Sequence, residues 1–176
     1  MFRGLTLPAR QEAAVTNRYI RIYLRDHLAM ATAGVDFARR CARENSDTVI
    51  GRELATLATE FEEEQDLLQE LMRRLEVEPS QGKIAIAWLA EKAGRLKLNG
   101  EVTKYSPLSL VLELEGLSAA VTAKIGLWRT IQVFQEHQPS LRAIPTGELL
   151  EQANRQRARI DAMHRNAART MYGAPE

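Results

Sequence analysis

Proline positions divide this chain into long segments that contain no helix-breaking proline. A proline inside a helix costs about 3 kcal/mol, because it removes a backbone hydrogen bond and clashes with the preceding turn. The long segments between the prolines have helix-forming compositions and repeat apolar residues about every 3.6 positions. The sequence therefore predicts an all-α protein. The prolines are Pro8, Pro79, Pro107, Pro139, Pro145 and Pro175.

The first long segment predicts a helical hairpin. Its first helix spans about residues 17–44, or begins as early as Pro8, and its second helix continues to about Leu75. Polar residues 45–47 end the first helix and cap the second. Because this connection is so short, the two helices must pack antiparallel. Their predicted inner positions include Ile20, Leu24, Ala31, Ala38 and Cys41, then Ile50, Leu54, Leu57, Phe61, Leu68 and Leu71.

The second half of the chain predicts another helical pair. Ser106 is the expected N-cap of a third helix, with Pro107 at its first position. This helix runs to about residue 134 and is apolar on nearly every side, so we expect it to be the most buried. Thr146 is the expected N-cap of a fourth helix over residues 147–171. The predicted inner residues of the fourth helix are Leu150, Ala153, Ile160, Ala167 and Met171. In the third helix, Gly116 and Gly126 predict places where a neighbouring helix approaches closely.

Residues 77–106 connect the two helical pairs. Residues 81–96 have the composition of a shorter helix that begins after Ser80. The Asn99-Gly100 pair is either the turn of a small hairpin or the break after that helix. We favour the helix break, because helical composition continues almost up to it.

Together these segments predict one domain over residues 1–176, with an N-terminal extension (1–16) and a short tail (172–176). The expected architecture is an antiparallel four-helix bundle with an additional short connecting helix between the second and third helices. The 24 lysines and arginines nearly balance the 23 aspartates and glutamates, which gives no global attraction to nucleic acid or anionic membranes. The sequence shows neither a secretory signal nor a membrane span, so we expect a cytoplasmic protein. The single cysteine, Cys41, is expected to be a buried thiol.

Ionisable residues interrupt the predicted apolar faces. His27 takes a core position in the first helix, and Glu64 stands where the second helix should present another leucine, with Glu60 one turn earlier. In the fourth helix, His164 takes a predicted core position between Ile160 and Ala167, and Asp161 lies one turn before it. The third helix contains two acids, Glu113 and Glu115, and is too apolar to keep both in water.

These ionisable side chains are predicted to lie at similar heights. His27 is about 19 residues before the first turn and Glu64 about 18 residues after it, which at ~1.5 Å per residue places them level within one helical turn. The same count separates Glu115 and His164 by roughly 7 Å, within the reach of a long side chain. All four helices would then contribute to one polar layer.

The carboxylates of such a layer need a cation, a metal ion or a proton beside them, because a buried unpaired carboxylate costs several kcal/mol. Two imidazoles with two or three carboxylates would suit zinc, manganese or iron. The alternative is a buried network of ion pairs and hydrogen bonds, in which Arg157 could contribute or Lys124 and Arg129 could neutralise the acids of the third helix. We favour the network without a metal and retain the metal site as the competing hypothesis.

Inward-facing carboxylates and histidines on four helices resemble the ferritin-like superfamily. Its members hold a di-iron or di-manganese centre with one Glu on each of two helices and Glu-x-x-His on the other two. Here Asp161-Ala-Met-His164 is similar to that motif with Asp in place of Glu, and Glu115 or Glu113 resembles a lone carboxylate. The resemblance covers about residues 17–171 as architecture.

The ligand motif is only partly present. The second helix offers Glu60 and Glu64, but neither is followed three residues later by histidine, and Asp26-His27 stand where the family would place glutamate. The resemblance therefore implies ferritin-like ancestry with an altered or lost metal centre. If a metal remains, one ion held by His27, Glu64, Glu115 and His164 fits the motif better than a pair.

Three functions are compatible with this sequence. We favour a non-catalytic bundle whose buried polar layer specifies packing. One alternative is a metal-binding protein or metal-dependent oxidoreductase of ferritin-like descent. The other is a binding module that uses the connector, whose basic residues outnumber its acidic Glu91 and Glu101; these basic residues are Lys83, Lys92, Arg95, Lys97 and Lys104. We also expect a homodimer, because the third helix is apolar nearly all round and the connector carries Ile84, Ile86, Trp88 and Leu89.

Overall fold

The described part of the chain consists of helices joined by short connections. A computed structural model describes residues 9–79 and 105–173, and no strand occurs in these residues. The prediction of an all-α protein with four long helices is therefore confirmed. The predicted helix over residues 81–96 and the Asn99-Gly100 break lie outside the described residues. The elements are α1 (Ala9–Glu44), α2 (Val49–Arg74), α4 (Pro107–His137), the 3₁₀ helix η1 (Pro139–Leu141) and α5 (Thr146–Tyr172).

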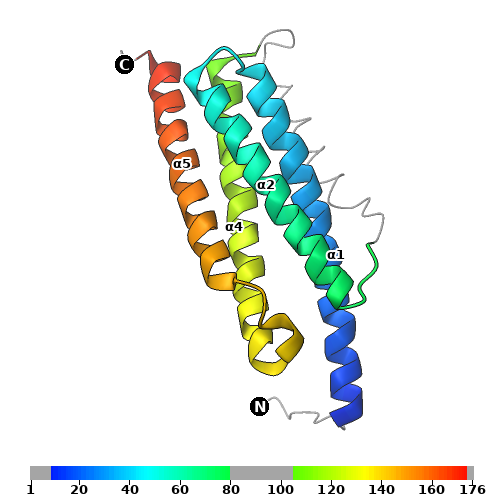
Figure 1. Cartoon of the computed structure of the whole chain (residues 1–176). Coiled ribbons are helices and arrows are strands. Elements are labelled where there is room, and N and C mark those ends of the chain that lie inside the picture. Colours follow the sequence, from blue (N-terminus) through cyan, green and yellow to red (C-terminus); the bar gives the residue numbers. More distant parts are fainter. Residues whose placement is uncertain (1–8, 80–104, 174–176) are drawn as a thin grey trace, which may run out of the picture.

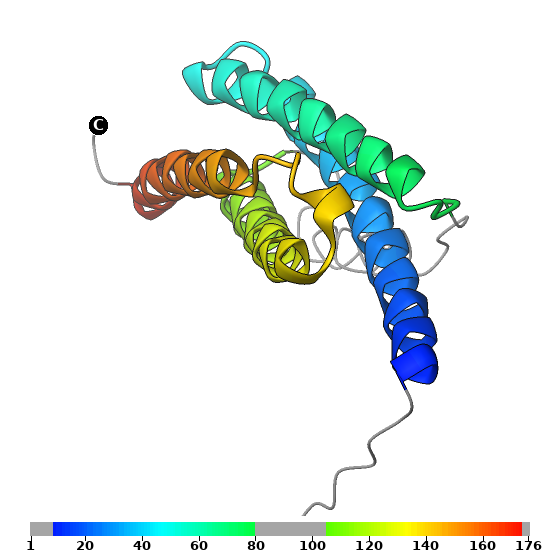
Figure 2. The ribbon, with the colours of Figure 1, turned by 60° about the horizontal axis from the view of Figure 1, so that its bottom comes forward.

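The helices associate as two hairpins (Figure 1). The most extensive contacts join α1 to α2 and α4 to α5, and a smaller interface joins α1 to α4. Figure 2 shows α4 lying between α5 and α1, with α2 crossing above them. The start of α4 lies beside the α1–α2 turn, where the Asn45 amide donates to Tyr105 Oη at 2.7 Å. Helices α2 and α4 therefore begin at the same end of the molecule.

Local sequence accounts for most helix ends. Helix α1 begins at Ala9, directly after Pro8, and so takes the longer of the two predicted extents. The Thr48 hydroxyl, rather than residues 45–47, caps α2 by accepting a hydrogen bond from Gly51 N at 2.9 Å. Ser106 caps α4 in a capping box, with Pro107 at the first position as predicted.

The start of α5 differs from the prediction. Thr146 lies inside the helix, and Pro145 occupies the N-cap position without a side-chain hydrogen bond. The Thr146 hydroxyl instead donates to Gln135 Oε1 at 2.9 Å, and Gln135 also donates to the carbonyls of Leu141 and Ile144. A tertiary contact with α4 has thus replaced the expected local cap.

Apolar side chains form two core clusters that meet near the middle of the molecule. One lies toward the α1–α2 turn and includes Leu57 and Leu117, and the other lies toward the α4–α5 connection and includes Leu71 and Trp128. Along α2, Glu64 falls between the members of the two clusters. In the described residues, no helix combines the length and apolar character needed to cross a membrane.

The two glycines of α4 behave differently. A Cβ added at Gly116 would lie 2.9 Å from the Phe37 ring, so the predicted close approach of a neighbouring helix is confirmed there. A Cβ added at Gly126 would meet nothing within 4 Å, so the prediction is wrong at that position.

Candidate functional site

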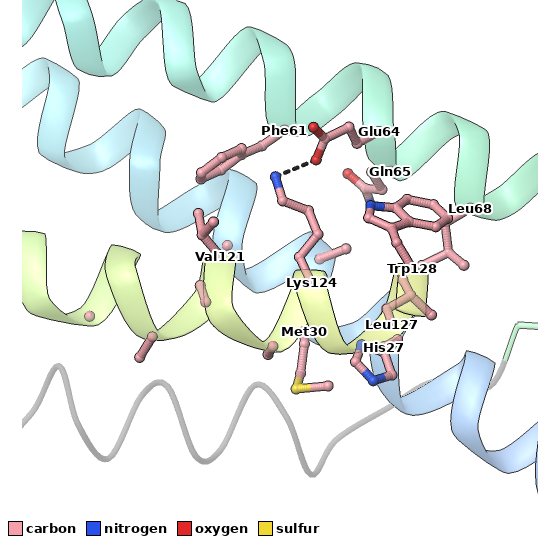
Figure 3. Close-up of a pocket in the computed structure, with 16 residues that line it drawn as sticks. His27, Met30, Phe61, Glu64, Gln65, Leu68, Val121, Lys124, Leu127 and Trp128 are labelled. Carbon is pink, nitrogen blue, oxygen red and sulfur yellow. Dashed lines mark ion pairs between the residues drawn. The ribbon is translucent and has the colours of Figure 1, made fainter. Parts of the chain in front are cut away.

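A buried ion pair joins α2 to α4 (Figure 3). The carboxylate of Glu64 pairs with the ammonium group of Lys124, and their side chains are 3% and 16% exposed. The Lys124 Nζ atom also lies 4.1 Å from the centroid of the Phe61 ring, a cation–π contact. Burial raises the pKa of Glu64 and lowers that of Lys124, while each partner's charge opposes the shift of the other. The pair therefore offsets part of a large desolvation cost.

Gln156 extends this ion pair to α5. Its side chain has no exposed surface (0%), and its amide nitrogen donates to Glu60 at 3.0 Å and to Glu64 at 2.9 Å. Its amide oxygen accepts a hydrogen bond from Lys124 Nζ at 2.5 Å. Because a neutral amide both donates and accepts, one residue satisfies partners on two other helices.

Arg159 carries the same chain of contacts toward the surface. One turn after Gln156, its guanidinium bonds Glu60 at 2.6 Å and also pairs with Glu53. Helices α2 and α5 are thus connected by a run of alternating donors and acceptors. The residues of this run form the polar layer, which consists of Glu53, Glu60, Glu64, Lys124, Gln156 and Arg159.

A cavity of about 110 Å³ adjoins the polar layer between α1, α2 and α4. Small side chains of α1 and α4 line it together with Glu64, Lys124 and Trp128 (Figure 3). Trp128 is 1% exposed, and its indole Nε1 has no hydrogen-bond partner among the described residues. A buried donor without a partner is rare in folded proteins and requires an explanation.

A second polar cluster lies at the α1–α2 turn. Tyr105 Oη donates to Glu113 at 2.8 Å, and the Arg40 guanidinium lies 3.7 Å from the same carboxylate. Burial raises the pKa of the Tyr105 hydroxyl. Burial and the neighbouring Glu113 raise the pKa of the Cys41 thiol, so this buried cysteine stays protonated and unreactive at neutral pH. Glu113 is therefore the acid of α4 that faces inward.

The predicted metal ligands are divided among three places. Glu60 and Glu64 lie together in the polar layer, whereas His27 lies on the cavity wall with its ring centroid 4.4 Å from that of Tyr23. Burial lowers the pKa of His27, although the nearby charge of Asp26 opposes this shift. His27 is therefore neutral at pH 7.

His164 and Glu115 pair near the surface. Their side chains are 34% and 56% exposed, and His164 Nε2 lies 3.3 Å from a Glu115 carboxylate oxygen. The core position predicted for His164 is taken by Met163, and Asp161 is partly buried. The predicted inner face of α5 was therefore wrong by one residue at this point. The same shift buries Leu149 more deeply than Leu150 and leaves Met171 exposed.

Residues 9–79 and 105–173 contain no group of three or more His, Cys, Asp or Glu side chains arranged to hold a metal ion. The cations that neutralise the acids also differ from those expected from the sequence. Lys124 pairs with Glu64 rather than with an acid of its own helix, and Arg159 takes the role predicted for Arg157, which is exposed.

Sequence reasoning missed Gln156, although a signal was present. The predicted inner face of α5 jumped from Ala153 to Ile160, and Gln156 lies three residues after the first and four before the second. That spacing places Gln156 on the same face. Because glutamine is polar, the pattern of apolar residues alone passes over it.

Comparisons of this chain with protein-family models, with curated proteins and with solved structures found no match.

Proposed function

We propose that this protein is a non-catalytic helical bundle of ferritin-like arrangement, in which the polar layer replaces a metal centre and specifies how the two hairpins pack. The observation that carries this proposal is the position of Gln156. It is fully buried on α5 and bonds Glu60 and Glu64 of α2 and Lys124 of α4.

Misalignment of the two hairpins would break the contacts of the polar layer. Apolar contacts between helices tolerate small slips, because one aliphatic side chain can replace another against the same surface. A slip of the α4–α5 hairpin along α2 would separate Glu64 from Lys124 and Gln156. Leaving a buried charge without its partner costs about 3–5 kcal/mol, which is a large fraction of the stability of an ordinary domain.

The order of the helices supports the ferritin-like part of the proposal. Helices α2 and α4 begin at the same end (Figure 1), so the connection between them joins opposite ends of the molecule. A bundle with one such long crossover is typical of ferritin-like proteins. The Glu64–Lys124 pair then lies in the interior, where that family would hold metal ligands, and the lysine supplies the positive charge.

A triple substitution of the central residues tests the proposal. The variant Glu64→Leu, Lys124→Met, Gln156→Leu removes the buried charges and leaves no unpaired partner among them. We expect it to remain helical and about as stable as the wild type, since apolar replacements of buried ion pairs are often neutral or stabilising. We also expect it to lose a unique packing, seen as broadened NMR resonances and mixed oligomeric species. Sharp spectra from a single species would contradict the proposal.

The homodimer also stays a prediction. Val133 is exposed on α4, and the apolar connector residues that motivated the prediction lie outside the described residues. We expect sedimentation at tens of micromolar to give a dimer, and a clean monomer would contradict this expectation.

A further inference from the structure

Helices α1 and α4 touch at two places that lie some distance apart. Toward the α1–α2 turn, Phe37 packs so closely on Gly116 that an added Cβ there would lie 2.9 Å from the ring. Toward the other end, Tyr23 Oη donates a hydrogen bond to Thr130 Oγ1 at 3.1 Å. On each helix fourteen residues separate the two contacts, which corresponds to about 21 Å. The space between the contacts is therefore long enough for about four turns of another helix.

An apolar groove lies between these two contacts. It is the part of the cavity that α1 and α4 line, and its residues are Met30, Ala31, Gly34, Ala119, Ala120 and Ala123. Because Ala119 is exposed, the groove reaches the surface of α4. Figure 3 shows Gln65 of α2 on one side of Lys124 and Met30 on the other. This α1–α4 groove therefore faces away from α2.

The described chain ends and resumes beside α1, at opposite ends of this groove. The carbonyl oxygen of Glu78 accepts a hydrogen bond from Arg25 Nε at 2.7 Å. Tyr105 Oη accepts a hydrogen bond from the Asn45 amide at 2.7 Å. Along α1, these two levels are twenty residues apart, or about 30 Å. Residues 80–104, which lie outside the described residues, have to span this distance in the same direction as α1.

The sequence of this segment matches the groove in length and in pattern. The helix predicted over residues 81–96 would be about 24 Å long, and the remaining residues can cover the rest of the distance. Its apolar residues recur at intervals of three or four and share one face, which consists of Ile86, Leu89, Ala93 and Leu96. Three charged residues fall on the opposite face, and they are Glu91, Lys92 and Arg95. A helix of this kind is stabilised by packing its apolar face against the protein.

We propose that residues 81–96 form a helix that docks its apolar face in the α1–α4 groove and runs parallel to α1. At the same rise per residue, Leu89 then lies within about one turn of Ala120 on α4. The segment is tethered at both ends, so its effective concentration at the groove is on the order of millimolar, well above that of a second copy at micromolar. The docking does not depend on the packing role of the polar layer.

Pairs of cysteines test this contact in the full chain. Leu89→Cys with Ala120→Cys should form an intrachain disulfide on mild oxidation. Glu91→Cys with Ala120→Cys turns the first thiol away from the groove, and Leu89→Cys with Thr122→Cys moves the second to an exposed position. Both control pairs should react roughly ten-fold more slowly, because a disulfide needs its two Cβ atoms close together. Cys41 should not compete, since it is fully buried and burial raises the pKa of its thiol.

A variant that fills the groove supplies an independent measurement. Ala120→Trp places a large ring in the groove, whereas Thr122→Trp adds the same ring at an exposed position of the same helix. Hydrogen exchange of the backbone amides of residues 81–96 should become about ten-fold faster in Ala120→Trp and stay unchanged in Thr122→Trp. The amides of α5 should keep their protection in both variants, which shows that the rest of the bundle is retained.

Three results would overturn the proposal. They are equal rates of disulfide formation in the three cysteine pairs, a disulfide that joins two chains, and equal protection of residues 81–96 in the two tryptophan variants. A non-reducing gel separates the first two results, because a disulfide between chains gives a covalent dimer and places a second copy in the groove. The triple substitution that tests the packing role uses a different readout, so either proposal can fail alone.

Discussion

Two acid–base pairs in this bundle show how burial changes the consequence of the same chemistry. Glu64 and Lys124 pair inside the molecule, where Gln156 completes their hydrogen bonding. Glu115 and His164 pair near the surface, where water can replace either partner. In the role that we propose, the first pair fixes the relative position of the helices, because leaving either charge without its partner in the interior is costly. The second can break at little cost.

The largest expected effect comes from removing one partner of the buried pair. Lys124→Met should destabilise the protein by about 3–5 kcal/mol, because it leaves the Glu64 carboxylate without its cation. Chemical denaturation would measure this loss. Arg129→Met changes an exposed cation on the same helix and should stay within about 0.5 kcal/mol of the wild type.

The pH dependence of Lys124→Met separates lost charge pairing from lost packing. Burial raises the pKa of Glu64, and the Lys124 charge opposes that shift, so the variant should hold the Glu64 proton more tightly still. Because the pKa of Glu64 is higher in the folded variant than in the unfolded chain, folding of the variant takes up a proton. The loss of stability caused by Lys124→Met should therefore shrink as the pH falls toward the ordinary carboxyl range near 4.3. A defect of constant size between pH 8 and pH 5 would show that Lys124 acts through packing alone.

A smaller effect is expected from His27 on the cavity wall. Burial lowers the pKa of His27. Just below the ordinary histidine pKa of about 6.5, His27 is therefore protonated in the unfolded chain but still neutral in the folded protein. The stability linked to His27 is therefore complete above that value and falls as the pH drops below it, until the folded protein also takes up the proton. His27→Gln should flatten this part of the stability curve between pH 7 and pH 5. If wild type and variant show the same slope, His27 is not desolvated.

The exposed pair should contribute least to stability. Removing either Glu115 or His164 should change the free energy of unfolding by about 0–1 kcal/mol, since surface ion pairs seldom contribute more. Thermal denaturation of Glu115→Gln and His164→Ala at pH 6 and pH 8 would measure it. A loss comparable with that of Lys124→Met would mean that burial does not separate the two pairs as described.

The difference between contacts within one helix and contacts between helices explains which helix ends could be predicted from the sequence. Ser106 and Pro107 were predicted correctly because an N-cap and the first residue of a helix depend on neighbours only three residues away. Thr146 was predicted wrongly because its hydroxyl finds Gln135 on another helix, a contact that local sequence does not specify. A capping residue is therefore predictable where its side chain bonds within its own helix, as at Ser106, and not where it bonds another helix, as at Thr146.

The polar layer was predictable only in part. Glu64 was recognised because it interrupts an apolar face, but its cation lies 60 residues later in the chain on a helix whose position the sequence does not give. His164 and Met163 are adjacent on α5 and differ by about 100° around the helix axis. Which of them faces the core depends on how α5 rotates against α4, and the apolar pattern was compatible with either.

The smallest expected effect is that of a chelator on the wild-type protein. A metal bound only to the folded state would stabilise it by mass action, so its removal would lower the melting temperature. In the network that we propose, Lys124 neutralises Glu64 and no metal contributes, so the melting temperature should not change. His27→Ala and His164→Ala should likewise respond to a chelator no differently from the wild type. A metal site would instead give a chelator-dependent wild type and two insensitive variants, with a metal-linked stability that disappears as histidine protonates near pH 6–7. That result would require Glu64 to bind a metal ion in place of Lys124. The polar layer would then be a metal-binding site and not a device that specifies packing.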